Sequence, residues 1–347
     1  MRADMMTTSS PWWQQVRRWV VGVDGSPSAE TALRWAIAHA PGRASSLQIV
    51  SAWQPPLYAP TVYGGPMSAP FELDQLEQAA TEEIERIAAE ARHDVTIPVD
   101  GIAVRGGAST ALLEASVQAS LLVLGTRGRG GFSRLLLGST SSQCAAHAEV
   151  PTVVVDDDWV ADSERRVLVG LDGSPNSLTA LDWALRFSRP GTTVEVMWVW
   201  DTSPLAVGAD EFFFPDAGET AELRFHHLVD QVVARVDTTD VTVERTFWRG
   251  RPREDLAMAS KNVDLVVVGA RGHGAVGAAL LGSVSSWLLH HVHRPLVVVP
   301  QAVEAGDRHA TATTTTDSAK RKPGVREILT RPILAGLLAE STKAKVT

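Results

Sequence analysis

Two loops of this chain combine glycine and serine in a spacing that suits the binding of phosphate groups. Each reads G-x-x-G, then nine residues, then G-S, from Gly125 to Ser139 and again from Gly269 to Ser283. Glycine permits positive φ angles and lets backbone N–H groups approach a ligand without interference from a Cβ atom. The closing G-S pair opens a predicted helix each time, and the N–H groups and dipole at a helix start favour anions. The two loops are therefore the candidate phosphate sites.

A lone G-x-x-G motif is more often a plain tight turn than a ligand site. Two copies with identical spacing, each between an apolar strand and a helix that starts with serine, favour the ligand site. The chain has neither a G-x-x-x-x-G-K-[ST] motif nor a G-x-G-x-x-G directly after a first strand. The usual P-loop and dinucleotide-binding motifs are therefore excluded.

An aspartate follows the first apolar strand of each half, Asp24 in the first and Asp172 in the second. Its carboxylate can form an Asx-turn or cap the next helix, which begins at a Ser-Pro pair. It can also hydrogen-bond a ribose hydroxyl or an adenine edge at the point where a doubly wound sheet changes direction. The two roles are compatible, and the sequence leaves both open.

The motifs occur in pairs because the chain repeats itself. Residues 18–27 (RWVVGVDGSP) recur as 166–175 (RVLVGLDGSP), and residues 121–128 recur as 265–272. The offset is 148 residues at the first block and 144 at the second. Such a near-constant offset indicates duplication of a whole domain with a short deletion in one loop.

Within each copy, short apolar strands alternate with predicted helices. Strands are expected at 19–23, 47–53, 96–104, 121–124 and 152–155, and again at 167–171, 193–199, 241–247, 265–268 and 296–299. Helices are expected from Ser26 onward and at 72–92, 109–118, 139–148, 177–187, 220–236, 252–260 and 283–291. We therefore predict an α/β fold with two tandem Rossmann-like doubly wound domains, each a five-stranded parallel sheet flanked by helices. A flexible C-terminal tail is expected at 301–347, where the composition becomes low-complexity and basic.

Composition narrows the classes of function. The net charge of −8 argues against nucleic acid as the main partner, because binding its phosphates requires clustered Lys and Arg. Cys144 is the only cysteine, so the chain forms no intrachain disulfide and a reducing compartment is expected. No apolar stretch reaches the ~18 residues that a membrane span needs, and the first residues lack the apolar core of a signal peptide. We therefore expect a cytoplasmic protein with no membrane partner.

On these motifs the chain resembles a tandem universal stress protein of the ATP-binding kind, over residues 16–300. The resemblance implies two domains, 16–156 and 164–300, each holding ATP with Mg²⁺. Asp24 and Asp172 match the family's aspartate near the nucleoside, and the backbones of Ala52 and Val199 match its adenine contact. The remaining expected nucleotide contacts are Gly125, Arg127, Gly128, Gly138, Ser139, Thr140 and Ser141 in the first domain, and Gly269, Arg271, Gly272, Gly282, Ser283, Val284 and Ser285 in the second.

The resemblance also implies how the halves associate. The last strand of the family pairs with its counterpart across a two-fold axis, so strands 152–155 and 296–299 would join the domains as an internal pseudo-dimer. We further expect a homodimer and an unidentified regulatory protein partner.

The two halves depart from the family pattern in different ways. His273 stands where the first loop has Arg129, and the loops at 55–70 and 203–217 share little with each other. The first glycine loop carries Arg127, Arg129 and Arg134, whereas the second keeps only Arg271. We therefore expect ATP to bind first at the N-terminal site.

Three functions compete on this sequence. The leading prediction is a regulatory nucleotide sensor in stress or growth control, because both loops are intact and no catalytic group is evident. A weak ATPase or nucleotide-dependent transferase would need a general base near the γ-phosphate, for which His273 is the candidate, and we expect at most slow hydrolysis. An oligomeric scaffold without ligand is the third alternative. A metal site is not expected, since His290 and His291 point to different helix faces and no Cys or carboxylate set joins them.

Overall fold

The computed structural model describes residues 17–55, 70–128, 137–160, 165–201, 217–272 and 281–300. The expectations for Arg129, Arg134, His273 and the tail at 301–347 lie outside these residues. Within the described residues the α/β prediction is confirmed, with two doubly wound halves in tandem.

Each half alternates strands and helices in the predicted order. The first contains β1 (Arg18–Gly22), α1 (Pro27–His39), β2 (Ser46–Trp53), α2 (Pro70–Asp94), β3 (Val99–Arg105), α3 (Ala108–Ser116), β4 (Leu121–Gly125), α4 (Ser139–His147) and β5 (Thr152–Val155). The second contains β6 (Arg166–Gly170), α5 (Pro175–Phe187), β7 (Thr193–Asp201), α8 (Ala217–Val233), β8 (Thr242–Gly250), α9 (Pro252–Ala259), a 3₁₀ turn (Ser260–Asn262), β9 (Leu265–Gly269), α10 (Ser283–Leu288) and β10 (Leu296–Val299).

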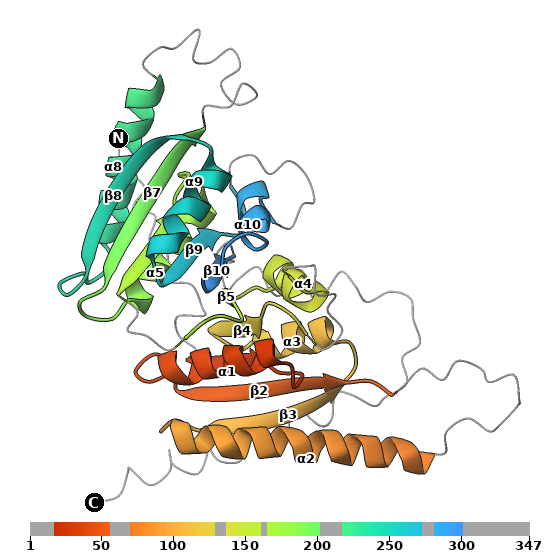
Figure 1. The fold of residues 1–347 in the computed structure, drawn as a ribbon. Coiled ribbons are helices and arrows are strands. Elements are labelled where there is room, and N and C mark those ends of the chain that lie inside the picture. The colour runs from red at the N-terminus through yellow and green to blue at the C-terminus, as the bar shows by residue number, and fades with distance from the viewer. Residues whose placement is uncertain are drawn as a thin grey trace, which may run out of the picture. The chain divides into compact units, whose positions relative to one another are not determined.

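The strands form one sheet in the order β3-β2-β1-β4-β5-β10-β9-β6-β7-β8. Five strands run parallel within each half, and the halves meet where β5 and β10 pair antiparallel, with Val153 opposite Val297. Figure 1 shows these two strands at the junction, with β3 and β8 as the outer edges. The pairing that the family resemblance implies is therefore present within one chain.

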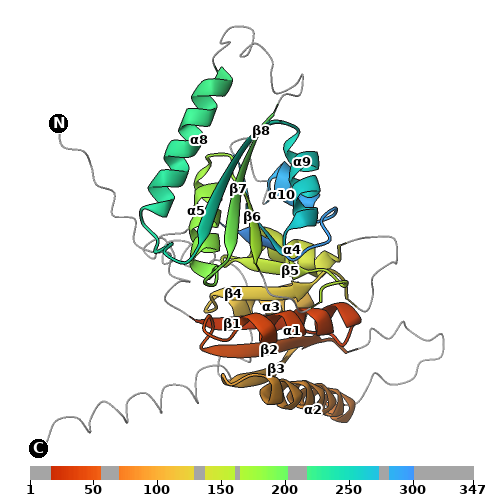
Figure 2. The same cartoon turned by 60° about the vertical axis from the view of Figure 1, so that its left-hand side comes forward.

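Burial follows the position of each strand in the sheet. Every residue of β4, β5, β9 and β10 is buried, whereas the edge strands β3 and β8 are largely half-buried or exposed. Strands that are buried on both faces need helices on both sides. Right-handed crossovers place α1 and α2 on one face of the first half, and α3 and α4 on the other. Figure 2 labels these helices in a turned view.

Serine caps start the helix that follows the first strand of each half. The Ser26 hydroxyl accepts the Ala29 N–H at 3.2 Å, and the Ser174 hydroxyl accepts the Ser177 N–H at 3.3 Å. A proline follows each cap, where its missing N–H costs nothing because that position has no partner within the helix. The predicted start of α1 at its Ser-Pro pair is confirmed, whereas α5, expected from residue 177, starts two residues earlier, at Pro175 of the equivalent pair.

Several predicted boundaries are displaced by a few residues, and two of these shifts have a clear local cause. The third strand begins at Val99 rather than at residue 96, because Pro98 has no N–H for the ladder and contributes only its carbonyl, which accepts the Leu47 N–H at 2.9 Å. Helix α10 ends at Leu288 rather than at residue 291, because the chain tightens into a turn in which the His290 N–H donates to the Trp287 carbonyl, three residues back.

The last turns of α1 and α5 meet between the halves in a stack of rings. The ring centroids of Trp35 and His39 are 4.2 Å apart within α1, and those of Trp183 and Phe187 are 4.4 Å apart within α5. His39 and Phe187 occupy equivalent positions in the two copies and stack on each other at 6.5 Å. Trp19 of β1 adds a further ring, 6.1 Å from Phe187. The apolar contact between the halves is therefore continuous from one helix to the other.

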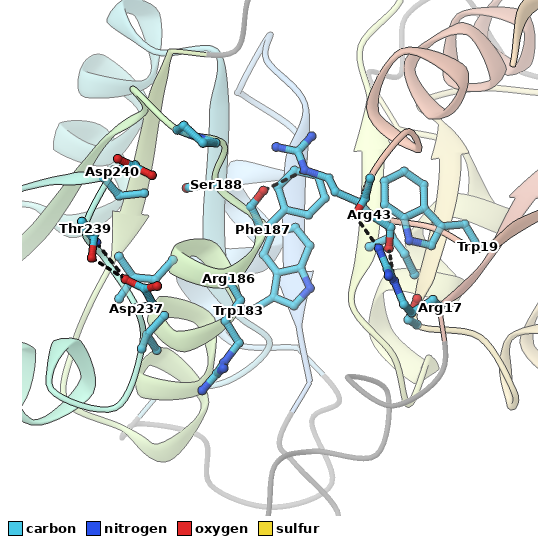
Figure 3. A pocket seen from close by; sticks show the side chains of 17 residues that line it. Arg17, Trp19, Arg43, Trp183, Arg186, Phe187, Ser188, Asp237, Thr239 and Asp240 are labelled. Carbon is cyan, nitrogen blue, oxygen red and sulfur yellow. Dashed lines mark hydrogen bonds between the residues drawn. The ribbon is translucent and has the colours of Figure 1, made fainter. Parts of the chain in front are cut away.

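Arginines reinforce this contact by reaching across it. The Arg43 Nε donates to the Phe187 carbonyl at 2.8 Å, and its guanidinium lies 3.8 Å above the Phe187 ring (Figure 3). In the opposite direction, Arg189 donates to the Ala38 carbonyl at 3.1 Å. Each helix end thus has terminal carbonyls satisfied by a cation from the other half.

Acid is expected to weaken the protein through His39. Burial is the main cause that lowers the pKa of His39 to about 4; the hydrogen bond to the Trp35 carbonyl opposes this shift, and the charges of Arg43 and Arg189 add to it. Unfolded His39 has its ordinary pKa near 6.5 and binds a proton first, so stability is complete above pH 6.5 and falls as the pH drops toward 4. We expect a loss of about 2 kcal/mol in the free energy of unfolding between pH 7.5 and pH 5.

Urea unfolding at both pH values measures this loss. His39→Phe introduces the residue found at the equivalent position of the second half, Phe187. It should reduce the loss of unfolding free energy between pH 7.5 and pH 5 by about 2 kcal/mol. His93→Phe, at an exposed position at the end of α2, is the control and should leave the dependence unchanged. Identical pH profiles for wild type and His39→Phe would refute the assignment.

Candidate functional site

Both glycine loops lie where two neighbouring parallel strands end. In the first half, β1 leads into Asp24-Gly25-Ser26 and the adjacent β4 leads into Gly125–Gly128. Since these strands run parallel, their carboxyl ends meet at one edge of the sheet, which is the switch point of a doubly wound domain. A cavity of about 690 Å³ opens there, and the equivalent cavity in the second half measures about 820 Å³. Both volumes fall in the range of small-molecule sites.

The structure brings the predicted site residues together at these two cavities. In the first half, the lining includes Asp24, Ala52, Arg127, Gly128, Gly138, Ser139, Thr140 and Ser141. In the second half, it includes Asp172, Val199, Gly269, Arg271, Gly272, Gly282, Ser283, Val284 and Ser285. Gly125 lies behind the first cavity, where its carbonyl accepts the Ser141 hydroxyl at 2.6 Å.

The expected reason for the motif glycines is wrong in one respect. None of the six motif glycines has a positive φ; that conformation occurs instead at Gly25 (φ 74°) and Gly173 (φ 80°), in the turns after β1 and β6. The motif glycines are required by close packing. A Cβ at Gly125 would lie 2.5 Å from the Ser28 carbonyl oxygen, and a Cβ at Gly128 would lie 2.5 Å from the Asp24 carboxylate.

Each aspartate therefore contacts both the turn after its own strand and the neighbouring glycine loop. The Asp24 Oδ1 accepts the Ser26 N–H at 3.0 Å, and the other oxygen packs against Gly128. In the second half, the Asp172 carboxylate accepts both the N–H and the hydroxyl of Ser174, at 2.9 and 2.6 Å, and lies against Gly272. The Asx-turn interpretation is confirmed. Because each aspartate also lines its cavity, the geometry leaves the nucleoside role open.

The start of α4 differs from the starts of α1 and α5. Its N-cap is Gly138, with φ −79° and ψ 158°, and no side chain caps the first turn. The N–H groups at such a start are donors that a bound anion can satisfy. Ser139 and Thr140, the next two residues, line the same cavity. Helix α10 has the same glycine cap but only six residues, so this argument applies with full weight only to the first half.

Two serines predicted to contact phosphate donate their hydroxyl protons to backbone carbonyls instead. Ser141 is buried and donates to the Gly125 carbonyl, and Ser285 donates to the Gly269 carbonyl, both at 2.6 Å. A serine hydroxyl has one proton, so in this conformation neither side chain donates to a phosphate oxygen. These serines tie the helix to the end of the preceding strand.

The other end of each cavity is apolar. Val23, Trp53, Ile84 and Ile87 line it beside Ala52 in the first half, and Trp198 and Leu256 line it beside Val199 in the second. None of these residues belongs to a motif of the sequence. The available signal was an aromatic in each second strand, Trp53 at the end of β2 and Trp198 within β7, but a buried strand also favours an aromatic there. An apolar slot facing a row of N–H donors suits a flat heterocycle attached to phosphate.

Asp157 is a further residue that the motif did not reveal. It follows β5, next to the end of β4, and forms an ion pair with Arg127 at 2.5 Å. The cation expected to face phosphate is thus shared with a carboxylate behind the loop.

A third cavity, of about 780 Å³, lies between the halves at the opposite ends of the strands (Figure 3). Its arginines are engaged: Arg17 donates to the carbonyls of Gly42 and Arg43, and Arg186 pairs with Asp182. No motif residue lines it, and its aromatic walls belong to the ring stack between α1 and α5.

Within the described ranges, no three His, Cys, Asp or Glu side chains cluster as metal ligands would. No helix in the same ranges has the length and apolar character needed to cross a bilayer. His273, the candidate base, lies outside the described residues.

The fold and the two cavities define a tandem doubly wound α/β protein with its pockets at the switch points. Both halves match the model of the universal stress protein family, over residues 15–156 and 164–300, and the chain belongs to that family.

Relatives agree along nearly their whole length. A universal stress protein of Mycolicibacterium smegmatis is 33% identical over 293 residues, which cover 81% of this chain and 96% of the relative. Universal stress protein Rv2005c of Mycobacterium tuberculosis is 31% identical over 294 residues, covering 82% and 97%. Among solved structures, a universal stress protein from Archaeoglobus fulgidus superposes with a TM-score of 0.59 at 19% identity, covering 82% of this chain and 96% of its own. At that identity the superposition concerns the fold.

Proposed function

We propose that this universal stress protein binds ATP in its two switch-point cavities and acts as a regulatory nucleotide sensor in stress or growth control. The observation that carries the proposal is the pairing of an uncapped helix start at Gly138 with a glycine loop that a Cβ would block. This arrangement presents backbone N–H groups to an anion at a place that side chains leave clear. It needs few cations, in keeping with the acidic charge of the chain.

The two ends of the first cavity suit the two ends of a nucleotide. Phosphates would lie at Gly128 and Gly138–Thr140, and the base would lie against Ala52, Ile84 and Ile87. Asp24, between the two ends, is the carboxylate that would reach a ribose hydroxyl. Mg²⁺ would be held chiefly by the phosphates and water, as is usual for this ion.

Occupancy can reach the rest of the molecule through α1. The Ser26 hydroxyl, which caps α1, also contacts the Arg127 carbonyl at 3.2 Å, so the glycine loop and the helix start are joined. The far end of α1 carries Trp35 and His39 to the contact between the halves. A nucleotide that binds the loop therefore acts on an element that extends from the pocket to the contact between the halves. This link is the basis for proposing a sensor.

Calorimetric titration of the purified chain with ATP, with and without Mg²⁺, tests the proposal. We expect saturable binding in both cavities, and native mass spectrometry should show co-purified nucleotide and its stoichiometry. Turnover in the same sample should stay below roughly 1 per second. Absence of binding at millimolar ATP would refute the proposal, and faster turnover would favour an enzyme instead.

A further inference from the structure

A small hydrogen-bond network lies behind the first glycine loop. The Thr126 hydroxyl donates to one oxygen of Asp157 at 3.0 Å, and Arg127 pairs with the other oxygen at 2.5 Å. Ser28 joins the network from α1: its hydroxyl lies 3.2 Å from the Thr126 hydroxyl and accepts the Arg127 N–H at 3.1 Å. Asp157 thus fixes the Arg127 guanidinium, while Ser28 fixes the Arg127 backbone N–H.

Asp157 is ionised in this network. Burial alone would raise the pKa of Asp157, but hydrogen bonds from Ser28, Arg127 and Thr126, with the charge of Arg127, bring that pKa below its usual value. The side chains of Arg127 and Asp157 are only 35% and 32% exposed, so solvent screens the pair incompletely. Arg127 lines the cavity and Asp157 does not, which places the compensating negative charge on the far side of the loop.

The second half carries other residues at the positions of this network. Ala270 stands at the position of Thr126, and Asn176 stands at the position of Ser28. The residue that matches Asp157 in sequence is Gln301, which lies outside the described residues. The two loops thus share their glycines but differ in sequence at these three positions.

We propose that Asp157 is a positioning residue that sets how many phosphates the first pocket favours. It holds the Arg127 guanidinium at the back of the loop and offsets its charge, so each added phosphate gains less there than it would if Asp157 were uncharged. The first pocket then distinguishes AMP, ADP and ATP less strongly than it would without this carboxylate. This inference rests on the proposed nucleotide binding and adds a specificity to it.

Asp157→Asn tests the inference, because it removes the charge and keeps the shape. The variant is made together with Gly282→Glu, which blocks the second pocket, and is titrated with AMP, ADP and ATP. Affinity for ATP should rise roughly fivefold, affinity for AMP less than twofold, and that for ADP by an intermediate factor, because the repulsion removed scales with ligand charge. The gain for ATP should shrink in high salt.

Asp158→Asn is the matched control, since it makes the same charge change one residue away on an exposed side chain. Asp158→Asn should leave the ratio of ATP to AMP affinity within twofold of the parent. Asp157→Ser, in contrast, should reproduce the change in this ratio seen with Asp157→Asn. Equal effects at Asp157 and Asp158 would overturn the inference. So would an equal loss of affinity for all three nucleotides, which would mean that Asp157 only supports the loop. If the parent binds no nucleotide at all, the proposed function itself fails, and this inference with it.

Discussion

Gly138→Glu is expected to abolish nucleotide binding in the first pocket while leaving the protein folded. Gly138 is the N-cap of α4 with a φ of −79°, which any residue can adopt. A Cβ there would lie 3.2 Å from the Thr126 carbonyl oxygen, a tight contact that a shift of a few tenths of an ångström relieves. The new carboxylate would accept the N–H groups at the helix start and occupy the place of a phosphate. Charge repulsion and lost donors together should weaken ATP binding by about 100-fold or more.

Calorimetry should then show one ATP site per chain where the parent shows two, with an unchanged thermal unfolding temperature. Gly282→Glu makes the same change in the second pocket and should remove the other site. Gly138→Gln adds a side chain of similar size without the negative charge, so this variant should bind ATP more tightly than Gly138→Glu. Full ATP stoichiometry in Gly138→Glu would mean that the start of α4 is not the phosphate site.

Phe187→Ala is the second change for which we expect a large effect, here on stability. Phe187 is 8% exposed, and its ring stacks with those of Trp183, Trp35, Trp19 and His39. Truncation would leave a void between the halves and remove the surface on which the Arg43 guanidinium rests. Loss of a buried aromatic ring costs about 3 kcal/mol or more in the free energy of unfolding.

Urea unfolding measures this cost, and a double-mutant cycle with Arg43→Ala should give a coupling energy of about 0.5–2 kcal/mol. Trp248→Ala is the control, because Trp248 is 54% exposed on the edge strand β8 and its loss should cost well under 1 kcal/mol. A cost below 1 kcal/mol for Phe187→Ala would show that the ring stack does not hold the halves together.

The repeat made the fold predictable. The apolar runs of β4 and β9 and the Ser-Pro pairs before α1 and α5 each specify one local structure, and each occurs twice. The displaced boundaries have local causes that periodicity does not contain. Pro98 shortens a ladder by lacking an N–H, and the end of α10 depends on a three-residue hydrogen bond after Trp287.

The candidate site was predictable in its residues but less so in its physics. Spacing identified Gly128 and Asp24 separately, but only the folded chain shows that one requires the other, since the carboxylate fills the space of a Cβ. Asp157 could not be found by motif, because it is 30 residues from Arg127 in the chain and becomes its neighbour only through the pairing of β4 with β5. Sequence patterns report what is local or repeated, and this contact is neither.

The antiparallel pairing of β5 with β10 has a consequence for how the two pockets can evolve. Because both strands belong to one chain, they meet at a high effective concentration, and the pairing survives any dilution. In a dimer of two identical single-domain chains paired through the same strands, every mutation would appear in both pockets at once. Here Thr126 and Ala270 already differ at matched positions. A covalent link between the halves therefore frees each pocket to acquire its own ligand preference within one continuous sheet.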